Sequence, residues 1–178
     1  MTNKKLIIFT DSGDTIIDEA TQVRDDRGIV LKADFIPGAG EVLKQLHDEG
    51  FTIALVADGE WESFQNVYRE NGLGYCFDAW IVSEVVGLQK PAPIMFETAM
   101  EALHLTDADR SRIVMIGNNL KKDIAGANRQ GMISVWLSWS PRYFQTVEEP
   151  DWQPDYTVAT PGELFTLLHK LEAELEGK

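Results

Sequence analysis

Residues 5–15 read Lys5-Leu6-Ile7-Ile8-Phe9-Thr10-Asp11-Ser12-Gly13-Asp14-Thr15, a short apolar run that ends in small and acidic residues. The run from Leu6 to Phe9 carries no charge and is too short for an ordinary helix. We therefore expect a strand that is buried on both faces of a parallel sheet. The turn after it leaves Asp11 at the carboxyl end of that strand, where open α/β sheets bind their ligands.

Strands and helices are expected to alternate over the rest of the chain. Apolar runs predict strands at 51–56, 79–82, 113–116, 133–137 and 156–159. Apolar stripes and capping residues predict helices at 37–50, at 61–72, after Lys90, from Leu120 to Gly131 and from Thr160 onward. Residues 16–36, with a turn at 26–28, predict a small β flap. The alternation favours a doubly wound parallel sheet in a three-layer α/β/α sandwich.

Length, charge and cysteine content limit the class of protein. The 178 residues, 44% of them hydrophobic, suit a single domain over 1–178. The formal net charge of −13 disfavours nucleic acid and anionic membranes as partners. Cys76 is the only cysteine, which excludes an internal disulfide and a thiolate metal cluster. The sequence shows no long apolar leader or membrane span, so we expect a cytoplasmic protein.

Aromatic residues crowd the stretch that follows the predicted strand at 133–137. Prolines in the same stretch oppose regular helix or central strand. We expect this loop mainly to pack against the core, although its place near the strand ends leaves contact with a substrate open. The residues concerned are Trp136, Trp139, Tyr143, Phe144 and Trp152, with Pro141, Pro150 and Pro154.

Four segments agree in order and spacing with a known set of motifs. They are 11–15 after the first strand, 52–59, 83–91 with its Lys90-Pro91 pair, and 116–127. Together they resemble the motifs of the haloacid dehalogenase (HAD) superfamily. The resemblance implies a Rossmann-type hydrolase domain. Many relatives insert a helical cap domain after the first motif, and here the flap at 16–36 is too short for one, so we expect a minimal-cap member.

The resemblance also implies roles for individual residues. Asp11 matches the nucleophile, which attacks phosphorus and forms an aspartyl-phosphate that water then hydrolyses. Lys90 matches the lysine that holds this nucleophile ionised and offsets charge on the phosphoryl group. The implied cofactor is Mg²⁺, held by the Asp11 carboxylate, the Gly13 carbonyl and a side chain of the fourth motif, Asn118 or Asp123.

Three positions depart from the family pattern. Gly13 replaces the second Asp of the first motif, which exchanges protons with the leaving group and with water, and the adjacent Asp14 is the candidate for that role. Ala57 replaces a hydroxyl residue that binds phosphate, so we expect backbone N–H groups around Ala57, Asp58 and Gly59 to bind it instead. Asn118 replaces an Asp, which predicts weaker Mg²⁺ binding.

Three functions fit these observations. The first is a Mg²⁺-dependent phosphatase of low activity that hydrolyses a small phosphorylated metabolite or a phosphorylated macromolecule. The second is a catalytically impaired domain that binds a phosphorylated ligand or a protein partner without turnover. The third is dehalogenase or phosphonate chemistry, which the lack of a cap opposes. Because a short flap leaves the site open to water, we expect either a large substrate or a second subunit of a homo-oligomer to close it.

Overall fold

The computed structural model of the chain describes residues 5–177. Its centre is a six-stranded parallel sheet in the order β5-β4-β1-β6-β7-β8. The chain fills one side of β1 with β4 and β5 and then crosses to the other side for β6, β7 and β8. This is the predicted doubly wound topology. The strands are β1 (Ile7–Thr10), β4 (Thr52–Ala57), β5 (Ala79–Val82), β6 (Ile113–Gly117), β7 (Ile133–Leu137) and β8 (Tyr156–Val158).

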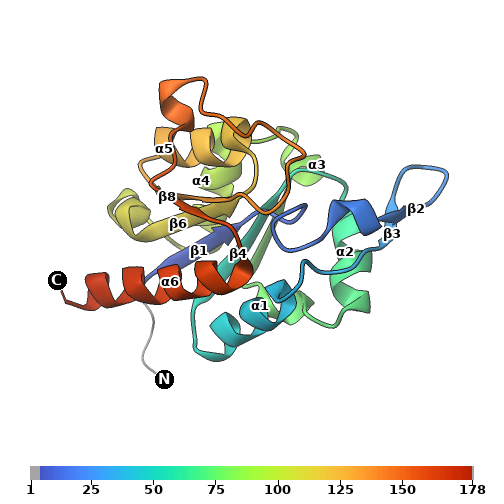
Figure 1. Cartoon of the computed structure of the whole chain (residues 1–178), viewed down its shortest axis with the longest axis horizontal. Helices are drawn as coiled ribbons and strands as arrows, with labels where there is room; N and C mark the ends of the chain where they lie inside the picture. Colours follow the sequence, from blue (N-terminus) through green and yellow to red (C-terminus); the bar gives the residue numbers. More distant parts are fainter. Residues whose placement is uncertain (1–4, 178) are drawn as a thin grey trace.

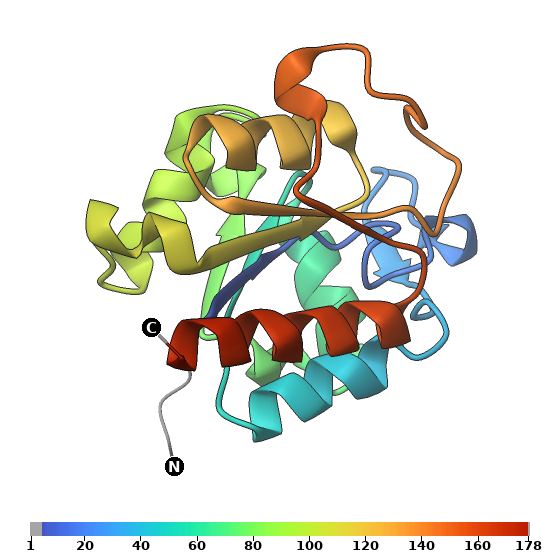
Figure 2. The same ribbon diagram turned by 60° about the vertical axis from the view of Figure 1, so that its left-hand side comes forward.

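Helices cover both faces of this sheet and complete the three layers. Figure 1 shows α4 (Pro93–Ala102) and α5 (Ala125–Arg129) on one face and α1 (Ala39–Asp48) and α6 (Pro161–Glu176) on the other. The turned view in Figure 2 shows the same arrangement. Two more helices are α2 (Trp61–Glu70) and α3 (Ser83–Val86). Short helical turns are η1 (Glu19–Thr21), η2 (Gly74–Cys76), η3 (Asp107–Arg112), η4 (Leu120–Ile124) and η5 (Pro150–Trp152).

The first strand is buried on both faces because successive side chains of a strand point to opposite sides. Ile8 belongs to the core that includes Leu43 of α1 and Leu168 of α6. Ile7 and Phe9 belong to the opposite core, which includes residues of α4. All three strand residues are no more than 2% exposed. The uncharged run at the start of the chain is therefore the central strand, as predicted.

The predicted β flap is present between β1 and α1. Its two strands are β2 (Val23–Arg24) and β3 (Val30–Lys32), which pair antiparallel and are joined by a turn in which Gly28 has φ 84°. The flap is held against α2, because Val30 N–H donates to Ser63 Oγ at 3.0 Å and Asn66 Nδ2 donates to the Val30 carbonyl at 3.0 Å. Figure 1 shows the flap beside α2 and projecting from the sheet.

Two helix starts follow the predicted capping chemistry. Asn119 Oδ1 accepts hydrogen bonds from the N–H groups of Lys121 and Lys122. The first turn after Asn119 is a π turn, however, and α5 begins only at Ala125. Thr160 Oγ1 accepts Glu163 N–H at 3.2 Å. The Glu163 carboxylate accepts from Ala159 N–H rather than from Thr160 N–H, so the predicted reciprocal capping box is shifted by one residue.

The aromatic loop between β7 and β8 only partly packs against the core. Trp152 is buried against η4 and the start of α5, and its ring lies 5.2 Å from that of Phe144. Tyr143, in contrast, lines cavities at the end of the sheet that are described below. Within residues 5–177, no helix has both the length and the hydrophobicity that crossing a membrane requires.

Candidate active site

The carboxyl ends of three neighbouring strands bring the first, second and fourth motifs together. Asp11 directly follows β1, Asp58 directly follows β4, and Asn118 directly follows β6. All three line one cavity of about 190 Å³, together with Lys90 and Asp123. The parallel sheet therefore places residues far apart in the chain at one edge, as the strand-end argument predicts.

Lys90 is the centre of this cluster. Its Nζ donates to Asp11 Oδ1 at 2.8 Å and to the Val56 carbonyl at 2.7 Å, and it lies 2.8 Å from Asp123 Oδ1. The Lys90 side chain is 1% exposed, whereas that of Asp11 is 16% exposed. The backbone N–H of Lys90 donates to Asp58 Oδ1 at 3.0 Å, which links the third motif to the second. All three ammonium protons of Lys90 thus have an oxygen nearby, and the lysine is fixed in place.

The charge state of Lys90 follows from its neighbours. Burial by itself lowers the pKa of a lysine, but the negative charges of Asp11, Asp123 and Asp58 outweigh burial and raise the pKa of Lys90 above its ordinary value. Lys90 therefore remains an ammonium ion at neutral pH. The fixed ammonium places a positive charge 2.8 Å from the partly exposed oxygen atoms with which Asp11 would act as a nucleophile.

Asp123 is buried behind Asp11. Its Oδ2 accepts the Asn119 N–H at 3.0 Å, and burial raises its pKa, against the opposing effect of Lys90. The glycine that ends β6 makes room for it, since a Cβ on Gly117 would lie 2.1 Å from Asp123 Oδ2. One oxygen of Asp123 lies beside the Lys90 ammonium and the other accepts a backbone N–H. These contacts let Asp123 orient its neighbours and limit its freedom to turn toward a cation.

Asn118 and Gly13 offer oxygen atoms that suit a magnesium ion. Asn118 is 2% exposed, lines the cavity, and neither its Oδ1 nor its Nδ2 has a hydrogen-bond partner in the structure. A buried amide without partners is costly, and coordination of Oδ1 to a cation would satisfy it. Gly13 also lines the cavity, and its bridge to Ile17 uses the Ser12 carbonyl and the Asp14 N–H, which leaves the Gly13 carbonyl outside the bridge.

The charge balance of the cavity also favours a divalent cation. Four carboxylates and two lysines line it, so two negative charges are in excess when all six groups are ionised. Mg²⁺ prefers oxygen ligands and keeps several of its waters, so it needs few protein atoms. Asp11, Asn118 and Gly13 therefore fit the ion, while Asp123 fits a supporting role. The lining charges come from Asp11, Glu19, Asp58, Asp123, Lys90 and Lys122.

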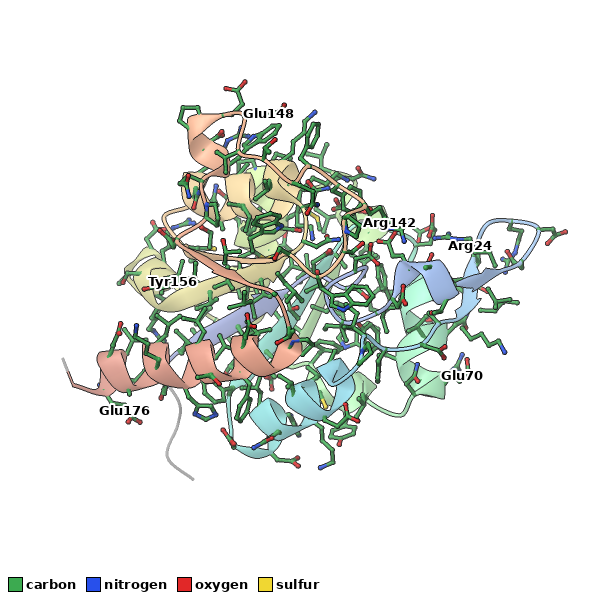
Figure 3. The ribbon with its side chains drawn as sticks, in the orientation of Figure 1. Arg24, Glu70, Arg142, Glu148, Tyr156 and Glu176 are labelled. Carbon is green, nitrogen blue, oxygen red and sulfur yellow. The ribbon has the colours of Figure 1, made fainter. Side chains whose placement is uncertain are left out.

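The structure does not bring Asp14 to this group. Asp14 has φ 47°, is completely buried and does not line the cavity. Its Oδ2 accepts from Ser140 Oγ at 2.7 Å and from Arg142 Nε at 2.6 Å, and its Oδ1 accepts the Glu19 N–H at 3.0 Å. The expected proton-transfer role of Asp14 is therefore opposed by geometry, because the turn directs its side chain into the loop after β7. Figure 3 labels Arg142 in that loop.

The expected phosphate-binding segment is only partly available. Ala57 is the last residue of β4, is 1% exposed and does not line the cavity. Gly59 lines it, but its N–H already donates to Ser83 Oγ at 2.9 Å. Asp58 accepts from Lys122 Nζ at 2.9 Å through its Oδ2. Of the predicted N–H groups, that of Gly59 is therefore engaged, and the segment also presents to the cavity a carboxylate held by a lysine.

Residues that the sequence did not assign to the site also line the cavity, and three of them carry a titratable side chain. Glu19 comes from η1 in the flap, Lys122 from η4, and Tyr143 from the loop after β7. Burial raises the pKa of Tyr143 to about 12, with Glu19, Asp11 and Asp14 adding to the effect, so its hydroxyl is a hydrogen-bond donor. Burial and Asp14 likewise raise the pKa of Glu19, while Arg142 opposes them. Two of them had a signal in the sequence, since Lys122 lies beside Asp123 in the fourth motif and Tyr143 belongs to the aromatic loop for which contact with a substrate was left open.

A second cavity adjoins the first beneath the flap. It has a volume of about 260 Å³ and shares Gly13, Glu19, Asp58, Gly59 and Tyr143 with the first. Arg24 and Val30 of the flap strands line its outer part. The flap therefore forms one wall of a two-part pocket that begins at Asp11 and extends under β2 and β3.

Comparisons with known proteins agree with this geometry. The profile of the haloacid dehalogenase-like hydrolases matches residues 4–131. A glyceraldehyde 3-phosphate phosphatase of Methanopyrus kandleri is 30% identical over 139 residues, covering 76% of this chain and 57% of the relative. The pyrimidine 5'-nucleotidase YjjG of Escherichia coli is 33% identical over 137 residues, with 76% and 57% covered.

A solved structure is similar as well. The HAD-hydrolase YfnB of Bacillus subtilis, solved bound to magnesium, has 25% sequence identity and a TM-score of 0.66, covering 76% of this chain and 56% of that protein. The chain spans about half the length of the curated relatives it matches. The part held in common includes all four motifs up to residue 131.

Proposed function

The chain belongs to the haloacid dehalogenase-like hydrolases, and from this premise we propose that it is a Mg²⁺-dependent phosphohydrolase that acts through Asp11. One observation carries the proposal. A buried, permanently charged Lys90 holds a partly exposed Asp11 at 2.8 Å, at the sheet edge where ligands bind. Relatives of the chain are named as a phosphatase and a nucleotidase, which supports phosphate esters as the substrate class.

Each residue of the site has a distinct role in the proposed reaction. Asp11 attacks phosphorus and forms the aspartyl-phosphate, and Lys90 keeps Asp11 ionised and offsets the charge of the transferring group. When Mg²⁺ is bound by Asp11, the Gly13 carbonyl and Asn118, it supplies positive charge to the phosphoryl oxygens. Lys122 and the Tyr143 hydroxyl lie on the cavity wall and contribute further donors to phosphate oxygens.

The two cavities favour a small substrate. Taken together, volumes of about 190 and 260 Å³ fall in the lower part of the roughly 300–1,000 Å³ of pockets that hold drug-sized ligands. We therefore propose a small phosphorylated metabolite, with its phosphate near Asp11 and the rest of the molecule under the flap. The flap takes the place of a cap over one side of the site. Closure by a second copy of the chain stays a prediction, and light scattering tests it.

The alternatives have less support. The curated relatives are named for their enzymatic activities, so they give no support to a domain that binds a ligand without turnover. A Schiff base requires a neutral amine, and the carboxylates around Lys90 keep it charged. Phosphonate chemistry through a Schiff base at Lys90 is therefore opposed by the site itself, and the short flap provides no cap for the halide pocket of a dehalogenase.

The proposal is tested by hydrolysis of p-nitrophenyl phosphate in Mg²⁺ and in excess EDTA. We expect turnover that requires Mg²⁺ and is abolished by Asp11→Asn. Asp107→Asn is the matched control, since Asp107 is 87% exposed and pairs only with Arg110 on η3. Beryllium fluoride, which mimics an aspartyl-phosphate, should raise the melting temperature of the wild type but not that of Asp11→Asn. Equal turnover by Asp11→Asn and Asp107→Asn would refute the proposal.

A further inference from the structure

Gly13 has an unusual neighbour. A Cβ built on Gly13 would lie 2.0 Å from Glu19 Oε1, 2.8 Å from Glu19 Cδ and 3.0 Å from Glu19 Cγ. The backbone at Gly13 does not have a positive φ, so its conformation is open to any residue. The Glu19 carboxylate therefore occupies the space that a side chain at position 13 would take, and a residue with a Cβ there would require Glu19 to move.

The Glu19 carboxylate also has access to the site. Its side chain is 24% exposed and lines both the cavity of Asp11 and the one under the flap. It therefore stands at the junction between the place proposed for the phosphate and the place proposed for the rest of the substrate. The oxygen that leaves with the rest of the substrate must lie at this junction, because it connects the two parts.

The surrounding structure holds Glu19 in this position. Its backbone N–H donates to Asp14 Oδ1 at 3.0 Å, at the start of η1. Arg142 Nε lies 3.4 Å from Glu19 Oε2 and also donates to Asp14 at 2.6 Å. The displaced Asp14 thus has a function of its own. It positions Glu19 directly through the backbone and indirectly through Arg142.

We propose that Glu19, and not Asp14, is the proton-transfer residue of this site, a flap carboxylate that replaces a side chain missing at Gly13. This inference rests on the proposed phosphohydrolase function. In the first step the Asp11 oxygen bonds to phosphorus, the bond from phosphorus to the leaving oxygen breaks, and the Glu19 carboxyl proton moves to that oxygen. In the second step Glu19 takes a proton from water as water attacks phosphorus, which releases phosphate and restores Asp11.

The first test varies the need for a proton. p-Methoxyphenyl and p-nitrophenyl phosphate are close in size, phenyl phosphate is the unsubstituted ester, and p-nitrophenolate leaves without a proton. In Glu19→Gln we expect kcat/KM for phenyl phosphate to fall about 10²–10⁴-fold and that for p-nitrophenyl phosphate to fall far less. Glu41→Gln on α1 makes the same chemical change away from the cavities and should match the wild type. Calorimetry should show that Glu19→Gln, which removes one of the four carboxylates of the cavity, weakens Mg²⁺ binding far less than Asp11→Asn does.

The second test exchanges the two side chains and does not depend on activity alone. Gly13→Ala should lower the melting temperature, because its Cβ overlaps Glu19, and Glu19→Ala in the same chain should restore it. Gly13→Asp combined with Glu19→Ala should regain the phenyl phosphate activity that Glu19→Ala loses. Each of these results supports a shared position for the two side chains.

The outcomes separate the two proposals. If the wild type hydrolyses no aryl phosphate, the phosphohydrolase function is refuted, and the role of Glu19 with it. If the wild type is active but Glu19→Gln lowers kcat/KM equally for all three esters, or for none of them, only the role of Glu19 is refuted. A loss of Mg²⁺ affinity in Glu19→Gln as large as that in Asp11→Asn would assign Glu19 to the metal and would likewise overturn the proposal.

Discussion

Replacing Lys90 by methionine tests the electrostatic core of the site through stability rather than activity. Lys90→Met keeps the length of the side chain and removes its charge. Asp11 and Asp123, which lie 2.8 Å from Nζ in the wild type, then lose their common cation. Removal of one partner from a buried ion pair costs about 3–5 kcal/mol, because a charge is left buried without compensation. For a chain of this size that corresponds to a melting temperature lower by about 6–20 °C.

The matched control is Lys122→Met in the same cavity. Lys122 pairs with Asp58 at 2.9 Å, but its side chain is 35% exposed, whereas that of Lys90 is 1% exposed. Exposed ion pairs contribute about 0–1 kcal/mol, so Lys122→Met should cost little stability. Both variants are measured by urea unfolding followed by circular dichroism, in EDTA so that bound metal does not contribute.

A second variant and a change of pH complete the test. Asp123→Asn in the Lys90→Met background should recover part of the lost stability, because it removes one of the uncompensated charges. Burial raises the pKa of Asp123, so its contribution to stability is present at low pH and is lost as pH rises through the folded-state value. Lys90→Met removes the lysine that opposes this shift, so the variant should lose more stability at pH 8 than at pH 5. If Lys90→Met costs no more than Lys122→Met, the reasoning is refuted.

Three further predictions concern single positions. Gly117→Ala places a Cβ 2.1 Å from Asp123 Oδ2 and should reduce both p-nitrophenyl phosphate turnover and the urea midpoint of unfolding. Gly162→Ala is the control, because the nearest atom to its Cβ lies at 4.0 Å, and it should change neither quantity. Asn118→Asp should bind Mg²⁺ more tightly in calorimetry, because a carboxylate replaces an amide, and unchanged affinity would remove Asn118 from the metal site. Asp14→Asn should lower stability by about 1.5–3 kcal/mol, since it weakens charge-assisted hydrogen bonds to a half-exposed Arg142, and an unchanged urea midpoint would contradict this.

The sequence by itself determined the sheet, most of the helices and the core of the site. An uncharged run such as Ile7–Thr10 is a buried strand in any parallel sheet, because only apolar side chains tolerate burial on both faces. Once the strands are parallel, their carboxyl ends meet at one edge. This argument placed Asp11 at the ligand-binding edge, and the resemblance to the family motifs added Asn118 and Asp123 to it without coordinates.

Only the tertiary structure decided what happens around Gly13. The direction of Asp14 depends on one backbone angle, φ 47°, and on Ser140, which lies 126 residues away in sequence. Glu19 reaches the space beside Gly13 because the flap folds back over the sheet edge, and neither residue carries a local pattern that predicts the other. Periodicity reports which residues are buried in a strand or helix. Side-chain positions in a turn depend instead on contacts between distant segments, and those exist only in the folded chain.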